Sequence, residues 1–371
     1  MTKSKLLFTP GPLNTGEATR NAMLKDVGSR DREFLDLVRD IRTRLLAIGG
    51  SAQSDGYECV LMQGSGTFAI ESVISSAIPR DGRLLILVNG AYGRRMVEMA
   101  RIHGIAVDIL ERPENRRILP LDVAAHLAVH PSTSHVAVVH CETTTGIVNP
   151  IEEIGAVVAD AGATYIVDAM SSFGAIPIDL RAARARFLIS SANKCIEGVP
   201  GFGFVLAQRE ALMAARGNAR TLSLDLHAQW AGLEREGQFR FTPPTHALLA
   251  FHQALLDHET EGGVAGRAAR YTRNHQTLAE GMAALGFVPY LDREDQSYII
   301  TTYRYLSDPE FSFEEFYSRL SELGFVIYPG KLSQEACFRI GTIGRLGAED
   351  IKNLLHAIGF VIGPMRQSCT R

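Results

Sequence analysis

One segment, from Ala163 to Phe204, constrains the fold of this chain more than any other. It contains two short apolar runs, TYIV and FLIS, and each leads to one charged residue: TYIV to Asp168 and FLIS to Lys194. Short runs of β-branched and aromatic residues between Gly and Pro are typical of buried strands in a parallel sheet. Because open α/β sheets bind ligands at the carboxyl ends of their strands, we expect Asp168 and Lys194 to lie at one edge of such a sheet.

An acid and an amine at the same edge allow two interpretations. The two residues can form a structural ion pair, or they can be unrelated surface charges. Alternatively, they serve a pyridoxal phosphate (PLP) cofactor, which needs a lysine for its Schiff base and an acid for its pyridinium nitrogen. The two residues alone favour neither interpretation, so the polar positions near other strand ends are needed to decide.

A glycine-rich turn, QGSGTF at residues 63–68, lies between a predicted strand and a predicted helix. This order aims backbone N–H groups and the positive end of the helix at an anion, and Ser65 and Thr67 add hydroxyl donors. The turn is neither GxGxxG nor a Walker sequence, since no lysine follows its last glycine. A phosphate cradle and a plain helix start capped by hydroxyls therefore both remain open.

Two other strand ends carry polar groups. Tyr92 follows a predicted strand at residues 83–88, and three threonines at 143–145 follow a predicted strand at 135–140. The tyrosine can stack on an aromatic cofactor or pack against the next helix. The threonines can bind a ligand or cap the helix predicted for 150–161.

Candidate substrate ligands lie at the two ends of the chain. Arg339, inside the short apolar stretch FRI, is either on a polar sheet face or a bidentate anchor for a carboxylate. The arm TPGPLNTGE is too rich in Pro and Gly for a helix or a central strand. It either wraps the surface or lines a pocket, with Asn14 and Thr15 as its polar candidates.

The second half of the chain changes in character. Residues 216–240 are polar and predicted to be irregular, and RFTPPTH at 240–246 is a stiff loop because its prolines exclude a helix or central strand. Such a loop is suited to reach a neighbouring subunit's site. From about residue 265, strands interleaved with helices indicate a small α+β domain.

Composition narrows the class of protein. A formal net charge of −3 implies no strongly basic face, so we expect no nucleic-acid partner. No stretch approaches the roughly twenty apolar residues of a membrane helix, and the first twelve residues do not resemble a secretory signal, so we expect a cytoplasmic protein. The cysteines form no CxxC pair, which predicts reduced thiols and no disulfide or metal site; they are Cys59, Cys141, Cys195, Cys337 and Cys369. Cys195 beside Lys194 is either reactive or a packed thiol.

Six stretches, taken in order, carry a resemblance to a known family. They are LFTPGPLNT, QGSGTF, NGAYGRR, VDAMSSFG, SANKCIEGVPGFGF and FRFTPPTH. Together they resemble fold-type I PLP aminotransferases of the branch that contains alanine- and serine-glyoxylate aminotransferases, and more narrowly the 2-aminoethylphosphonate–pyruvate transaminases. The resemblance implies an α/β fold with a large domain built on a mostly parallel seven-stranded sheet and a smaller C-terminal α+β domain. The boundaries we expect are an N-terminal arm at 1–16, a large PLP-binding domain at 17–260 and a small domain at 261–371.

The resemblance also implies residue roles. Lys194 would hold PLP as an aldimine and move the substrate proton, and Asp168 would pair with the pyridine nitrogen. Arg339 matches the family arginine that binds the keto-acid carboxylate, and Asn14 stays a further substrate candidate. The other implied cofactor contacts are Ser65, Gly66, Thr67, Tyr92, Thr143, Met170, Asn193 and, from the partner subunit of a homodimer, Thr242.

The implied reaction is a ping-pong transamination in phosphonate catabolism. The amino group of 2-aminoethylphosphonate passes to pyruvate, giving phosphonoacetaldehyde and L-alanine. Because this donor lacks an α-carboxylate, Arg339 must accept a phosphonate or leave it to other groups. The alternatives are an alanine- or serine-glyoxylate aminotransferase of the same fold and, from another class, a non-catalytic nucleotide-binding protein. A cysteine desulfurase is disfavoured, because its catalytic cysteine would have to be Cys337, beside the FRI strand.

Overall fold

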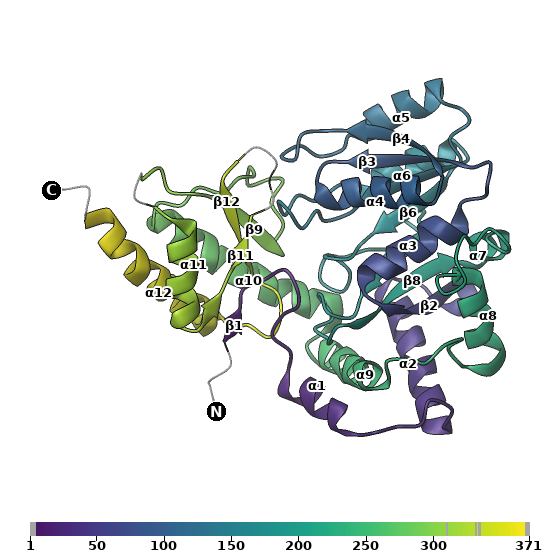
Figure 1. Cartoon of the computed structure of the whole chain (residues 1–371), viewed down its shortest axis with the longest axis horizontal. Helices are drawn as coiled ribbons and strands as arrows, with labels where there is room; N and C mark the ends of the chain where they lie inside the picture. Colours follow the sequence, from purple (N-terminus) through teal and green to yellow (C-terminus); the bar gives the residue numbers. More distant parts are fainter. Residues whose placement is uncertain (1–4, 309–310, 331, 333–334, 368–371) are drawn as a thin grey trace.

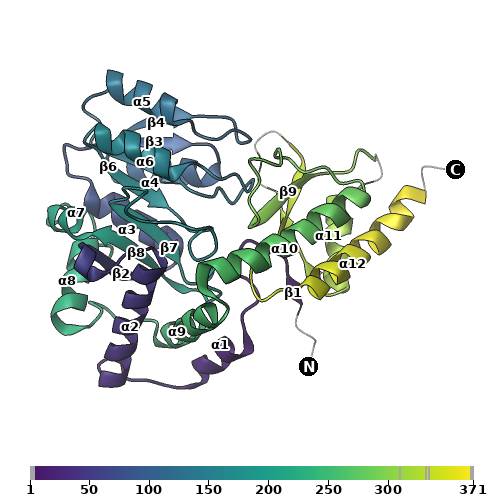
Figure 2. The same ribbon diagram turned by 180° about the vertical axis from the view of Figure 1, so that it is seen from behind.

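The computed structural model describes residues 5–308, 311–330, 332 and 335–367. Two parts lie side by side: a larger one built on a seven-stranded sheet and a smaller one built on a three-stranded sheet (Figure 1). The chain begins against the smaller part, crosses to the larger one, and returns to the smaller part to end (Figures 1 and 2). None of the helices in these described ranges is long and apolar enough to cross a membrane.

The large sheet has the strand order β2-β8-β7-β6-β5-β3-β4. Its strands are β2 (Tyr57–Gly64), β3 (Arg83–Val88), β4 (Ala106–Glu111), β5 (His135–Val139), β6 (Thr164–Asp168), β7 (Phe187–Ser191) and β8 (Gly201–Gln208). All neighbours from β7 to β4 pair in parallel, and only β8 runs antiparallel to the strands beside it. The mostly parallel seven-stranded sheet is therefore confirmed. β8 is antiparallel to both neighbours and lies inside the sheet between β2 and β7.

Helices cover both faces of this sheet (Figures 1 and 2). They are α2 (Arg32–Ile48), α3 (Gly66–Ala77), α4 (Ala91–Ile102), α5 (Pro120–Val129), α6 (Ile151–Asp160), α7 (Arg209–Ala214), α8 (Leu226–Glu236) and α9 (Thr245–Thr260). Shorter helical turns are α1 (Glu17–Asn21), η1 (Ala22–Leu24) and η2 (Gln53–Asp55). Because both faces are covered, β5 and β7 are buried along their whole length, which explains their unbroken apolar runs.

Helix α8 corrects the prediction that residues 216–240 are irregular. Its first turn is capped by Asp225, whose side chain accepts a hydrogen bond from the Ala228 amide, and Gly237 ends it in a left-handed conformation. Leu226 and Leu233 are buried on one face of the helix. These start and stop signals are present in the sequence, but the polar residues between them hid the apolar spacing.

The smaller part contains an antiparallel sheet of order β11-β12-β9. These strands are β9 (Ile300–Arg304), β11 (Tyr328–Pro329) and β12 (Cys337–Gly341), and the helices around them are α10 (Gly263–Ala284), α11 (Phe313–Glu322) and α12 (Ala348–Gln367). Ile327, whose side chain is buried in the core, separates β11 from a short strand just before it, β10 (Phe325–Val326). β10 pairs in parallel with β1 (Leu6–Leu7) of the N-terminal arm.

A buried amide pair joins the carboxyl ends of β3 and β5. Asn149 Nδ2 donates to Asn89 Oδ1 and to the Val139 carbonyl at 3.0 and 2.8 Å, and Asn149 Oδ1 accepts from Asn89 Nδ2 and the Ile118 amide at 2.9 and 3.0 Å. Both side chains are almost fully buried. The pair therefore satisfies backbone groups that have no water to bind.

Replacing Asn149 by Ala is expected to lower the free energy of unfolding by about 2–4 kcal/mol, because it leaves several buried polar groups without partners. Urea denaturation measures this change. The matched control is Asn353→Ala on the exposed side of α12, which we expect to stay within about 0.5 kcal/mol of the parent. Equal effects of the two substitutions would show that the buried amide pair contributes nothing.

Candidate active site

One pocket at the carboxyl ends of the parallel strands collects most of the predicted site residues. Asp168 ends β6, Lys194 follows β7, and the glycine-rich turn joins β2 to α3. The predicted residues that line this pocket are Ser65, Gly66, Thr67, Tyr92, Thr143, Asp168, Met170, Asn193 and Lys194. Gly11 of the N-terminal arm also lines this pocket. Of the two interpretations given for the arm, wrapping the surface or lining a pocket, the second therefore applies.

The Lys194 amine has lost most of its contact with water. Its Nζ donates a hydrogen bond to the Pro10 carbonyl of the arm at 2.6 Å. Burial lowers the pKa of Lys194 to about 8, against smaller opposing effects of Cys195 and Asp168. An amine with this pKa is partly neutral near neutral pH and can therefore act as a nucleophile or a base.

Asp168 is almost fully buried at the end of β6. Its Oδ1 accepts a hydrogen bond from the Met170 amide at 2.8 Å. Burial raises the pKa of Asp168 to about 6, although the Met170 amide, Lys194 and Arg95 oppose the rise. Asp168 and Lys194, both in the described part of the chain, form no ion pair with each other, so the structural ion pair does not hold. Asp168 is buried and Lys194 is half-buried, and both line the same pocket.

The start of α3 lines another side of the pocket, through Ser65, Gly66 and Thr67. Its N-cap residue, Ser65, makes no capping hydrogen bond with its side chain, and the amides of the first turn have no acceptor within the helix. A β-carbon on Gly66 would lie 2.1 Å from Met170 Sδ, so only glycine lets Met170 pack against this turn. A free hydroxyl and free amides at the positive end of a helix are suited to an anion.

Tyr92 lies at the start of α4 beside two charged residues that we did not single out from the sequence. The Tyr92 amide donates to Glu142 Oε1 at 2.8 Å, and the Arg95 guanidinium lies 4.8 Å from the Tyr92 ring centre. Burial raises the pKa of Glu142 to about 7, and its Oε2 has no partner among the described residues. Arg95 lies three positions after Tyr92 in the helix, so both side chains are on the same helix face. This spacing is the sequence signal that could have identified Arg95.

Arg339 is fully buried on β12 of the smaller part, next to Thr143 of the pocket lining. Its guanidinium donates to the Pro329 carbonyl at 2.9 and 3.0 Å and to the Thr143 carbonyl at 3.0 Å, and it lies 4.8 Å from the Tyr328 ring centre. Arg339 and Arg95 form no ion pair with any described acidic residue. Arg339 is buried and Arg95 is half-buried, and an anionic ligand would supply the opposite charge that both lack among the described residues.

Like Arg339, two further predicted residues, Asn14 and Thr242, lie outside the lining of this pocket. The Asn14 side chain bonds the amide and carbonyl of Leu7 at 3.2 and 2.9 Å, which folds the arm back on itself. Thr242 is exposed, and its carbonyl accepts from Gln63 Nε2 at 3.4 Å, next to the glycine-rich turn. Their roles stay predictions.

Three of the cysteines, Cys59, Cys141 and Cys195, are buried thiols. Cys195 Sγ donates to the Ser171 carbonyl at 3.3 Å, and burial raises the pKa of this thiol to about 12. Burial raises the pKa values of Cys59 and Cys141 to about 12 as well. Cys195 is therefore a packed thiol, and Cys369 lies outside the described residues.

Comparison with known proteins identifies the family. The family described as aminotransferase class-V matches residues 18–308. The chain belongs to this family. Among the curated relatives of this class-V aminotransferase, a 2-aminoethylphosphonate–pyruvate transaminase from Salmonella paratyphi A is 52% identical over 358 residues, covering 96% of this chain and 97% of that protein. One of the same name from Pseudomonas putida is 46% identical over 365 residues, covering 98% and 99%.

A solved structure supports the fold. The crystal structure of an alanine–glyoxylate aminotransferase from Nostoc sp. superimposes with a TM-score of 0.90 at 26% identity, and the match covers 98% of this class-V aminotransferase and 96% of the Nostoc chain. The fold-type I aminotransferase architecture that the sequence resemblance implied is thus confirmed. The pocket described above lies where open α/β sheets bind ligands.

The lowered pKa of Lys194 predicts how fast this lysine captures the aldehyde of added PLP. Only the neutral amine attacks a carbonyl carbon, so the rate should rise about tenfold per pH unit up to about pH 8 and then level off. Stopped-flow absorbance of the apoprotein mixed with PLP measures this rate. A rate that keeps rising through pH 10, as expected for a lysine amine in water, would contradict the effect of burial.

Proposed function

We propose that this protein is a PLP-dependent transaminase that moves the amino group of 2-aminoethylphosphonate to pyruvate, giving phosphonoacetaldehyde and L-alanine. The observation that carries the proposal is the joint placement of the Lys194 amine, the buried Asp168 carboxyl and the start of α3 in one pocket. A nucleotide-binding protein needs the anion site at the start of α3, but it needs neither the Lys194 amine nor the buried Asp168 carboxyl. The curated relatives named for this reaction, 46–52% identical along nearly the whole chain, support the choice of substrates.

The residues of the pocket fit PLP. When bound, this group supplies an aldehyde carbon that takes up the amine and a ring that withdraws electrons. Ser65, Thr67 and the first amides of α3 would hold its phosphate, and Asp168 would hold its ring nitrogen. The aromatic face of Tyr92 would cover the ring. The remaining contacts, from Thr143, Met170 and Asn193, come from residues that line the same pocket.

Lys194 and Asp168 then have separate tasks. Lys194 would hold the cofactor between turnovers, and its amine, once free, would take the proton from the amine-bearing carbon of the donor and deliver it to the cofactor side of the bond. A pKa of about 8 allows both directions of transfer near neutral pH. Asp168, buried with a pKa of about 6, would be ionised near neutral pH and would keep a proton on the ring nitrogen of the bound cofactor.

The two substrates bring anions of different shape, a phosphonate and a carboxylate. The pocket region offers two guanidinium groups without acidic partners among the described residues, Arg95 in the pocket lining and Arg339 next to it. Arg339 is fixed by backbone carbonyls of Pro329 and Thr143, which suits a planar bidentate contact with a carboxylate. Arg95, whose Nη1 donates to Thr67 Oγ1 at 3.5 Å, lies on the side of the anion-binding helix start. We assign the phosphonate to Arg95 and the keto-acid carboxylate to Arg339.

The proposal is tested by single half-reactions with a panel of amino donors. Mixing the PLP-loaded protein with 2-aminoethylphosphonate should bleach the visible absorbance of the bound cofactor, and pyruvate should restore it. Lys194→Ala should lower turnover by at least about 10³-fold, because the base and the covalent anchor are lost together. Lys352→Ala, on the exposed face of α12, is the matched control and should keep full activity.

The alternative is an alanine- or serine-glyoxylate aminotransferase, which the likeness to the Nostoc structure supports. Under that alternative, serine or alanine bleaches the cofactor absorbance and 2-aminoethylphosphonate leaves it unchanged. A colourless protein without a lysine adduct after borohydride reduction would instead indicate a nucleotide-binding protein.

Replacing Arg95 by Met should lower kcat/KM for 2-aminoethylphosphonate on the order of 10- to 100-fold, because a hydrogen bond between charged groups is lost. In a ping-pong reaction kcat/KM for pyruvate reports the other half-reaction, so it should change less than about threefold. Arg94→Met is the matched control, since Arg94 pairs with Glu111 at 2.5 Å and does not line the pocket. Equal losses for both substrates would show that Arg95 holds the cofactor and not the donor.

We also propose a homodimer in which Thr242 of each chain contacts the phosphate in the other chain's pocket. The exposure of Thr242 and of its neighbour Phe241, which is 44% exposed, supports this arrangement. The division into an arm at 1–16, a large domain at 17–260 and a small domain at 261–371 remains a prediction, as does the cytoplasmic location.

A further inference from the structure

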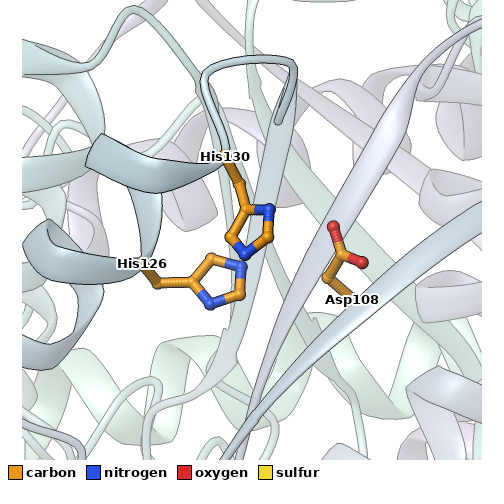
Figure 3. Close-up of side chains that lie close together, drawn as sticks. All are labelled: Asp108, His126 and His130. Atoms are coloured by element: carbon orange, nitrogen blue, oxygen red, sulfur yellow. The ribbon is translucent and has the colours of Figure 1, made fainter.

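A second group of chemically reactive side chains lies away from the pocket, at the far edge of the large sheet. Asp108 is on β4, the edge strand, while His126 and His130 are on α5 and at its C-terminal cap (Figure 3). None of the three lines the pocket that contains Lys194. The transamination proposed above does not use them.

The three side chains converge. One nitrogen from each histidine and one carboxylate oxygen all lie within 4.8 Å of one another. The two imidazole rings lie with their centres 4.4 Å apart, and the Asp108 carboxylate is on the adjacent strand (Figure 3). Histidines four residues apart share one face of a helix, so the spacing itself brings the two rings together.

His126 is the least satisfied member of the cluster. Its Nε2 is inaccessible to water and has no hydrogen-bond partner among the described residues. A buried imidazole nitrogen without a hydrogen-bond partner can bind a metal ion through its lone pair.

Asp108 has a second partner in Arg83. Arg83 Nη1 lies 2.9 Å from both of its carboxylate oxygens. Carboxylates that bind metals are commonly held by a second hydrogen-bonding group in this way. The contact fixes the carboxylate plane and leaves lone pairs of its oxygens for another ligand.

We propose that Asp108, His126 and His130 form a binding site for one divalent transition-metal ion of the zinc type. Two imidazoles and one carboxylate match the ligand preferences of Zn²⁺, Co²⁺, Ni²⁺ and Cu²⁺ and not those of Ca²⁺ or Mg²⁺, which select oxygen ligands. Three protein ligands leave a fourth tetrahedral position for water. The bound ion ties the C-terminal end of α5 to the edge strand β4.

The test uses the full chain in its PLP-loaded form, stripped of metals with EDTA and dialysed against ZnCl₂ in the absence of amino substrates. The parent protein should bind one tightly held Zn²⁺ per chain. His130→Ala and Asp108→Asn should each weaken this binding by at least about tenfold, because one ligand is lost. Excess Zn²⁺ should raise the melting temperature of the parent and not that of either variant.

Two controls make the outcome decisive. His356→Ala removes an exposed histidine of α12 that belongs to no such cluster in the described part of the chain, and it should bind Zn²⁺ like the parent. Co²⁺ bound to the parent should show the visible absorption of a four-coordinate ion, and this absorption should disappear in His130→Ala. Unchanged Zn²⁺ binding in both ligand variants, or no binding by the parent, would overturn the proposal.

Discussion

The parallel pairing of β7, β6, β5 and β3 is the constraint on which the rest of the structure depends. Strands that run in the same direction end at the same edge, so the residues that follow them meet there without being close in sequence. Asp168, Lys194 and Thr143 owe their proximity to this pairing alone. The helices that return the chain between strands cover both faces, and the edge at the strand ends remains as the place where polar groups can gather.

Burial then sets the chemistry of those groups. The same loss of water lowers the pKa of Lys194 to about 8 and raises that of Asp168 to about 6, because in each case the charged form is disfavoured. Arg339, fully buried, is held by backbone carbonyls and an aromatic ring without a carboxylate among the described residues. A site of this kind keeps its charges uncompensated until a ligand with a complementary charge pattern enters.

The smaller part of the molecule is linked to the Lys194 loop through a buried ionic network. Glu197, three residues after Lys194, accepts hydrogen bonds from the Tyr271 hydroxyl and from Arg270 of α10 at 2.6 and 2.7 Å. Arg270 also donates to the Gly344 carbonyl at 2.6 Å, just beyond β12, which carries Arg339. These contacts tie the segment just beyond β12 to the loop that carries the Lys194 amine.

The sequence by itself determined the features that depend on local pattern. Apolar runs located the strands around Asp168 and Lys194, and the glycine-rich turn located the start of α3, because periodicity and turn chemistry act over a few residues. Only the tertiary structure decided which distant groups meet: the Pro10 carbonyl at Lys194, Arg95 and Glu142 beside Tyr92, and the imidazoles of α5 facing Asp108. The tertiary structure also shows that the Asn14 side chain hydrogen-bonds to the Leu7 backbone within the N-terminal arm. Such contacts arise from strand order and helix packing over tens to hundreds of residues, which no short stretch of sequence encodes.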